Sequence, residues 1–332
     1  MNGPLLQRLA IAALVSVVAL IFVGAIVRVS GAGLGCPDWP TCWGCLIPPW
    51  KKEQVDLSRI DFERFRAKAE GLGRDPESVT PERILDSFNP LHTWTEFVNR
   101  LCSLPVGLFT LATFIVATVR RPRRGAVFWA AFASLVLVLF NAWLGARVVY
   151  SGLKPGVITL HMAAAMLLIA LLVFTAWAAA GDRRWRIVLD GPAAAWARRA
   201  IVLLLVVTVA EGVLGSQVRE MTDRMKLDLD GAPRSAWAGQ LEQTAVYLLH
   251  RSFSWVIMAA AAAHFLLARR ARRGTTGPCE WLILAVVLAQ MVLGAFMSQV
   301  VIHPVAQVLH VGLGAVLLCA EALWFLASRA RE

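Results

Sequence analysis

Charged residues are scarce in this sequence. They make up only 17% of its 332 residues, whereas 58% are hydrophobic and the mean hydropathy is +0.62. So little charge cannot cover the surface of a soluble globular domain of this length. The composition excludes that class and is typical of a polytopic membrane protein.

Acidic residues are also few, since 22 Asp and Glu stand against 33 Lys and Arg, for a net charge of +11. In a soluble domain this excess would indicate a nucleic-acid partner. Here the basic residues form short clusters between apolar segments, so they indicate membrane orientation and no nucleic-acid partner is expected. A small-residue cleavage site is lacking after the first apolar segment, so Leu9 to Val27 is expected to be a membrane helix.

Eight segments of about 20 apolar residues are long enough to cross a hydrocarbon core of about 30 Å. Their expected limits are 9–29, 93–119, 126–147, 157–180, 200–218, 244–268, 280–301 and 305–327. Sixteen Lys and Arg residues fall on one side of these spans, at Arg8, 120–124, 183–199, 269–273 and 329–331, and six fall in the short loops opposite. The positive-inside rule then predicts a multi-pass protein of a bacterial-type plasma membrane, with both termini cytoplasmic and loop 30–92 outside.

The long loop 30–92 is the only sizeable polar piece of the chain. Residues 56–72 have the pattern of a short amphipathic surface helix, and Thr80-Pro81 is typical of a helix start. A solvated cap without chemistry is the alternative interpretation for residues 50–90.

Three of the six cysteines, Cys36, Cys42 and Cys45, lie in this loop. An external, oxidising compartment favours a disulfide between two of them, and the sequence leaves open which two. Zinc bound by all three is an alternative. Residues 42–45 form a CxxC motif, but the histidine that covalent haem attachment needs is lacking, because Leu46 follows.

The two halves of the chain resemble each other weakly. Residues 141–146 (NAWLGA) match 290–295 (QMVLGA), and a histidine follows the glycine of each motif by 16 residues. These histidines are His161 and His310. Matching spacings indicate an internal duplication.

A second match aligns residues 96–100 (EFVNR) with 247–251 (YLLHR), which places Asn99 opposite His250. Four spans per copy give both halves the same orientation, related by an axis along the membrane normal. We therefore predict an all-α protein with two pseudo-symmetric four-helix bundles, residues 1–190 and residues 191–332.

Histidine is costly inside a membrane and usually functional there. His250 and His310 lie at similar depth in two spans of the second half. Two imidazoles that face each other across a bundle can bind a haem iron from both sides, so the pair is predicted to hold haem b. Two buried histidines that only pack against neighbouring helices are the alternative.

The first half has one histidine, His161, opposite Asn99, which is a poor iron ligand. A haem there would have one strong axial bond and a weak or open position, which suits chemistry rather than electron transfer. Glu96 lies one helical turn from Asn99 on the same face and is a candidate for proton transfer, with a structural pair to Arg100 or Arg28 as the alternative.

Two arginines directly follow the aligned positions, Arg100 after Asn99 and Arg251 after His250. Each is expected either to meet haem propionates or to extend to the membrane interface. The remaining histidines, His92, His264 and His303, fall at span ends or in loops and are expected to be solvated.

These residues give the chain a resemblance to the haem A synthase family. It is carried by residues 28–36 (RVSGAGLGC), Asp38-Trp39-Pro40 and Cys42, together with the intramembrane residues described above, and it covers nearly the whole chain. The glycine-rich stretch with its cysteines is the specific part of the pattern.

The resemblance implies an eight-span enzyme that oxidises the C8 methyl of haem O to a formyl group. It implies haem b on His250 and His310, haem O near Glu96, Asn99, Arg100 and His161, and a disulfide between Cys36 and Cys42. The chain departs from the family at Asn99, where many members have histidine, and in the extra thiol of Cys45.

Expected partners are haem O, a haem O synthase that supplies it, membrane lipid and an electron donor that the sequence does not name. The sequence leaves a homo-oligomer open. One alternative function is a b-type cytochrome that passes electrons between quinol and a partner without modifying haem. A transporter is disfavoured, because glycine and proline gather at span ends rather than in mid-membrane.

Overall fold

The computed structural model describes residues 3–71, 75–120, 125–152, 155–228, 236–300 and 302–329. Eight helices in it are long and apolar enough to cross a membrane, and no strand occurs in the described ranges. They are α1 (Gly3–Val29), α4 (Pro90–Arg120), α5 (Ala126–Tyr150), α6 (Pro155–Ala179), α7 (Pro192–Asp228), α9 (Ala245–Ala271), α10 (Pro278–Gln299) and α11 (Pro304–Arg329). The predicted class, all-α with eight spans, is confirmed.

Proline stands at the first residue of five of these helices: α4, α6, α7, α10 and α11. Its missing N–H costs nothing there, because the first helical N–H groups have no partner within the helix. Seven of the predicted spans agree with the helices to within about six residues. The exception is α7, which was predicted as 200–218 and instead begins at Pro192 and continues to Asp228.

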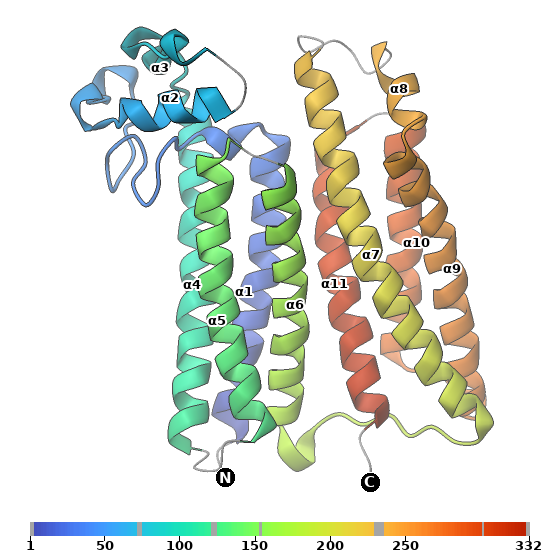
Figure 1. Cartoon of the computed structure of the whole chain (residues 1–332). Coiled ribbons are helices and arrows are strands. Elements are labelled where there is room, and N and C mark those ends of the chain that lie inside the picture. The colour runs from blue at the N-terminus through green and yellow to red at the C-terminus, as the bar shows by residue number, and fades with distance from the viewer. Residues whose placement is uncertain are drawn as a thin grey trace.

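The eight helices stand in two groups of four (Figure 1). In one group α1 contacts α4 and α6, while α5 closes the ring; in the other α7 contacts α9 and α11, while α10 closes the ring. The groups meet where α11 packs on α1 and α6, and where α6 packs on α7. The α1–α11 and α6–α7 contacts are equivalent if each half is superposed on the other, as a two-fold relation requires.

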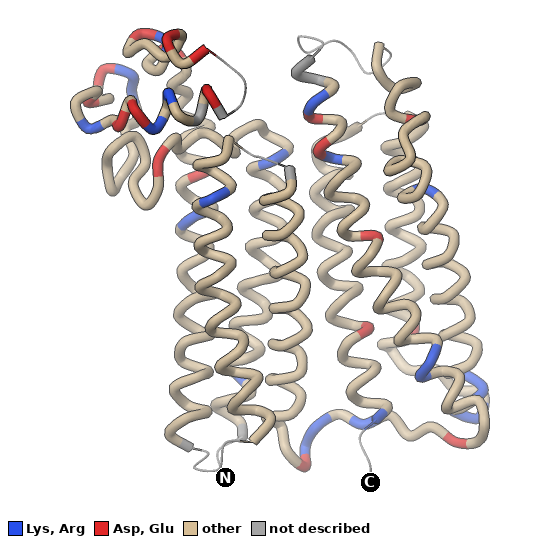
Figure 2. Tube along the Cα trace, in the orientation of Figure 1, with Lys and Arg blue, Asp and Glu red and all other residues tan. Residues whose placement is uncertain are grey.

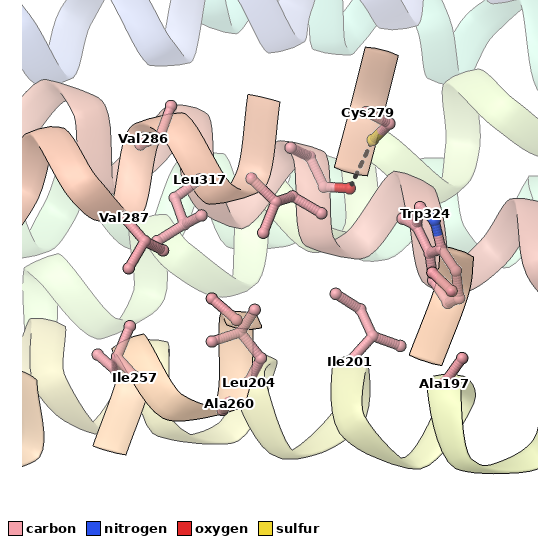
Figure 3. Close-up of a cluster of buried hydrophobic side chains, with 14 of the residues drawn as sticks. Ala197, Ile201, Leu204, Ile257, Ala260, Cys279, Val286, Val287, Leu317 and Trp324 are labelled. Carbon is pink, nitrogen blue, oxygen red and sulfur yellow. Dashed lines mark hydrogen bonds between the residues drawn. The ribbon is translucent and has the colours of Figure 1, made fainter. Parts of the chain in front are cut away.

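Small and branched apolar side chains fill the space between helices. In the second group, Ala197, Ile201 and Leu204 recur on one face of α7 at helical spacing and are completely buried against α9 and α11 (Figure 3). Large apolar side chains such as Leu104, Val206 and Val292 stay exposed on the outer faces. An aqueous surface would not tolerate so many, whereas a lipid surface does.

The loop after α1 folds into a cap over one end of the first group (Figure 1). It contains α2 (Phe62–Gly71) and α3 (Pro81–Asp86), and a small core in which Trp43, Ile60 and Ile84 are buried. The predicted helix start is confirmed, because the Thr80 side chain accepts a hydrogen bond from Arg83 N at 3.3 Å. The predicted helix at 56–72 is shorter, since α2 begins at Phe62.

The start of α1 and the end of α11 lie at the end of the molecule opposite this cap (Figure 1). Lys and Arg gather at the two ends and leave the middle of the helices nearly uncharged (Figure 2). Arg121, Arg123 and Arg124, Lys154, Arg234 and Arg331, which entered the predicted charge asymmetry, lie outside the described residues. Arg219 and Arg224, predicted to lie in a loop, belong to α7.

Candidate functional site

The imidazoles of His250 and His310 face each other inside the second group of helices. His250 is on α9 and His310 on α11, and their ring centroids are 6.4 Å apart with nearly perpendicular planes, at 83°. Imidazole nitrogens bind transition metals at about 2 Å, so two imidazoles that share one ion have ring centroids roughly 6 Å apart. The pair is neither directed to lipid nor too widely spaced to share a metal.

Glycines on the neighbouring helices approach both rings. A Cβ atom on Gly215 of α7 would lie 3.2 Å from His250 Cε1, and one on Gly294 of α10 would lie 3.8 Å from His310 Cε1. His310 Nδ1 is buried without a hydrogen-bond partner. Because a buried imidazole nitrogen normally has a partner, this atom marks a site that the protein's own side chains do not complete.

The first group presents the repeat-related residues in the same way. Gly145 of α5 would place a Cβ 3.6 Å from His161 Cε1 on α6, and Gly24 of α1 would place one 3.9 Å from Asn99 Oδ1 on α4. Asn99 Oδ1 is buried and has no hydrogen-bond partner. All four aligned positions therefore face a glycine on an adjacent helix, and at three of them a buried polar atom has no hydrogen-bond partner: Asn99 Oδ1, His250 Nδ1 and His310 Nδ1.

Two side-chain amides contact the backbone of the fourth span, α6, and of the last span, α11. Gln290 Nε2 of α10 donates to His310 O at 2.9 Å. Its aligned residue Asn141 of α5 satisfies its neighbours when its amide nitrogen faces His161, 3.1 Å from the carbonyl oxygen and 2.9 Å from Nδ1. In the sequence, Asn141 and Gln290 serve only to align the two halves. Their polar side chains inside apolar spans are the signal that marks them as contacts of the histidine-bearing helices.

Glu96 and Arg100 form an ion pair one turn apart on α4. Arg100 Nε lies 3.3 Å from Glu96 Oε1, and the Glu96 side chain is only 7% exposed. The structural pair that the sequence left open beside proton transfer is therefore present. Arg28, the other named partner, instead pairs with Asp223 of α7 at 3.1 Å and so joins the two groups.

Arg100 also holds the cap. Its Nη1 donates to the carbonyl oxygens of Asp38 and Thr41, both at 2.8 Å, and its Nη2 donates to Cys36 O at 3.2 Å. A planar guanidinium can reach several acceptors at once, which makes arginine suited to this position. The guanidinium of Arg100 thus donates to three backbone carbonyl oxygens of the cap. Its contact with a propionate of the substrate stays a prediction. Arg251, its aligned residue, is exposed.

Cys36 and Cys42 form a disulfide, which confirms that pairing. Cys45 is a free thiol, so zinc bound by all three cysteines is wrong for this loop. The Asp38 carboxylate accepts hydrogen bonds from Trp43 N at 2.7 Å and Gly44 N at 2.9 Å, which closes the turn after Cys42.

The loop sits tightly on the start of α4. Trp43 Nε1 donates to Gly35 O at 2.8 Å, and Thr93 Oγ1 donates to the same oxygen at 2.9 Å. A Cβ on Gly35 would lie 2.2 Å from His92 O, so only glycine fits there. The disulfide loop is thereby fixed directly over the helix that carries Glu96 and Asn99.

The prediction that His92, His264 and His303 are solvated is wrong for His264. His303 is exposed and His92 is half-buried, but His264 is completely buried. Its ring packs edge-on against Trp324 at 4.2 Å, and its Nδ1 lies 3.3 Å from Ala197 O. Helix α9 extends past the expected end of its span, so His264 falls inside the packed bundle rather than at its end.

Taken together, the fold and these buried positions define a polytopic membrane protein with two groups of four helices and a disulfide-bonded cap on one group. The chain belongs to the family of cytochrome oxidase assembly proteins described as COX15-CtaA, which it matches over residues 7–321. Its similarity to haem A synthases, expected from the motifs, is confirmed.

Proteins named "Heme A synthase" from three bacteria illustrate this relationship. The protein of Rhizorhabdus wittichii is 27% identical over 328 residues, covering 93% of this chain and 90% of that protein. The protein of Sphingopyxis alaskensis is 28% identical over 328 residues, covering 92% and 87%. The protein of Caulobacter vibrioides is 28% identical over 323 residues, covering 91% and 90%.

Proposed function

We propose that this protein is a haem A synthase, a membrane oxidoreductase that converts the C8 methyl of haem O into a formyl group. The names of the relatives and the match along nearly the whole chain support the activity. The two halves are proposed to have different roles, and one observation carries this assignment. In the second half the ring of His250 lies 6.4 Å from the ring of His310, whereas the first half has Asn99 at the position aligned with His250.

In the second half, His250 and His310 are the residues that would hold the iron of haem b. The ring spacing and the unpartnered Nδ1 of His310 support this assignment. Haem b held by two imidazoles would supply one-electron transfer there. Arg251 is exposed and directly follows His250 in the chain, so it is the candidate for a contact with a haem propionate.

In the first half, His161 is the candidate ligand for the iron of the substrate haem O. The neutral amide of Asn141 lies 2.9 Å from the His161 Nδ1 and orients the ring. Asn99, which is aligned with the ligand position His250, is a poor iron ligand and would leave room for the oxidation.

Glu96 is the candidate group for proton transfer. With dioxygen as the oxidant, conversion of a methyl to a formyl group also reduces oxygen to water, which consumes electrons from the donor together with protons, so the site needs a group that relays protons. Arg100 fixes one carboxylate oxygen of Glu96, and the buried position keeps the carboxylate away from bulk water. Asn99 lies one turn away on the same face of α4.

We assign the capped end to the outside of a bacterial-type plasma membrane, with both termini cytoplasmic. The disulfide requires an oxidising compartment, and it lies in the cap, opposite the chain ends. Haem O, a haem O synthase that delivers it, and an electron donor are the partners that this function needs.

Identification of the bound haems tests the proposal. The protein is expressed with and without a source of haem O, and the extracted haems are separated and weighed by mass spectrometry. We expect haem b in both preparations and haem A only where haem O is supplied. If haem b alone is found in the presence of both oxygen and haem O, the protein is a b-type cytochrome instead.

A further inference from the structure

A carboxylate lies beside one of the two imidazoles of the second half. Glu211 is on α7, four residues before Gly215, and its Oε1 is 3.1 Å from His250 Nδ1. Its other oxygen, Oε2, is buried and has no hydrogen-bond partner. Acidic residues are expensive in the middle of a membrane helix, so one that is kept next to a histidine has a specific use.

An ionised carboxylate and a neutral amide differ in how they affect the position of the proton on a neighbouring imidazole. An ionised carboxylate only accepts hydrogen bonds, so at Nδ1 it draws the ring proton to that nitrogen and leaves Nε2 with a free electron pair. At the aligned His161 the neighbour of Nδ1 is the neutral amide of Asn141. The two histidines therefore have different neighbours, a carboxylate in the second half and an uncharged amide in the first.

The contact between His250 and Glu211 is an ion-pair contact but not yet a hydrogen bond. The separation of 3.1 Å is within ion-pair range, but the ring N–H of His250 does not point at the carboxylate. The side chains of His250 and Glu211 are mostly buried, at 23% and 14% exposed. A rotation of the ring would align its N–H with the carboxylate, and a Cβ at position 215 would lie only 3.2 Å from His250 Cε1, so glycine there keeps that side of the ring open.

We infer that Glu211 is a positioning residue for the haem b ligand His250, and that it lowers the reduction potential of that haem. This rests on the proposed haem b site. Hydrogen bonding from a ligand's second nitrogen to a carboxylate raises the basicity of the ligand, and a more basic ligand stabilises ferric over ferrous iron. The negative charge acts in the same direction. Electrons are then passed on toward the first half more readily than a neutral neighbour would allow.

The test is the midpoint potential of haem b in the full-length protein, measured by spectroelectrochemical titration of E211Q. The amide keeps the size of the side chain but removes its charge. We expect E211Q to retain haem b and to favour the ferrous form at least tenfold, which for a one-electron couple is an upward shift of about 59 mV. The low-spin ferric electron paramagnetic resonance signal should shift as well, since it reports the ligand field.

Glu321 provides the matched control. It is a completely buried carboxyl on α11 whose Oε1 accepts a hydrogen bond from Thr208 at 2.9 Å, and it contacts neither imidazole. E321Q should shift the potential clearly less than E211Q and leave the resonance signal unchanged. Equal shifts in the two variants would mean that buried charge alone acts, and would overturn the role assigned to the contact with His250.

The outcomes separate this inference from the function beneath it. If the unaltered protein carries no haem b, the proposed function fails and the inference with it. If haem b is present and E211Q has an unchanged potential, only the inference fails. Should E211Q lose haem b, E211D decides: it keeps the charge but withdraws the carboxylate by one methylene, and an unchanged resonance signal in E211D would overturn the inference.

Discussion

At the scale of single residues, the two halves differ most at one pair of aligned positions, and this difference assigns them different functions. His250 and Asn99 occupy aligned places, each beside a glycine, yet only one is a strong metal ligand. Because the surrounding helices are arranged alike, the difference in chemistry comes from the side chains themselves. Substitutions at these positions therefore report on function more directly than on folding.

Removal of either imidazole of the second half should abolish the optical spectrum of bound haem b. A bis-imidazole site loses one of its two strong bonds when either ring is deleted, and the two rings here lie 6.4 Å apart. The measurement is the reduced-minus-oxidised spectrum of purified His250→Ala and His310→Ala. His303→Ala, at an exposed histidine, should leave the spectrum intact; unchanged spectra in the first two variants would refute the assigned ligands.

Glu96→Ala should stop formation of haem A while haem b stays bound. The substitution removes the proposed proton-transfer group from the first half, whose described ion pair is with Arg100 of the same helix. Arg100 keeps its three carbonyl acceptors, so the cap should stay in place. Yield of haem A, measured after extraction, checks this, with Glu63→Ala on the exposed face of α2 as control. A normal yield would reject the role of Glu96.

At the scale of elements, the cap and α4 behave as one unit because Arg100 joins them. Hydrogen bonds to a charged group contribute about 1.5–3 kcal/mol each, and a lysine in this position cannot reach several acceptors in one plane. The loop 36–42 should therefore open more often when Arg100 is replaced. The disulfide in that loop makes the opening measurable.

Arg100→Lys should let a membrane-impermeant thiol reduce the Cys36–Cys42 disulfide about tenfold faster, since 1.4 kcal/mol corresponds to tenfold in population. The rate is followed by tagging the released thiols and resolving the tagged protein by mass. Lys52→Ala, at an exposed residue paired with Asp86, should reduce at the unaltered rate. Equal rates in all three proteins would show that Arg100 does not hold the loop.

At the scale of the whole molecule, the two groups of helices are joined by close contact of α1 and α11. Gly312 of α11 lies against Phe22 of α1, and a Cβ at this position would come within 2.1 Å of the ring. Polar contacts join the groups nearer the capped end, where Arg28 pairs with Asp223 and Thr159 hydrogen-bonds to Ser216 at 3.1 Å. The arrangement of both candidate sites depends on this interface.

Gly312→Ala should destabilise the interface by about 1–3 kcal/mol, because an added methyl group in a packed contact displaces its neighbour. Thermal unfolding in detergent measures the change. Gly107→Ala in α4 is the matched control, since a Cβ there meets nothing within 4 Å and alanine favours the helix. If Gly312→Ala and Gly107→Ala unfold at the same temperature, the close packing at Gly312 does not stabilise the interface between the two groups of helices.

Sequence alone determined the class, the eight spans and the aligned positions, because apolar runs of membrane length and repeated spacings are one-dimensional patterns. The division of the chain near residue 190 and the haem assignments stay predictions. The structure added what depends on approach in space: that His250 lies 6.4 Å from His310, that Arg100 binds the disulfide loop, that α7 extends far past its apolar run, and that His264 is buried. Glu211 is 39 residues from His250 in the chain, and only helix packing brings them together, since α7 and α9 turn their faces toward each other.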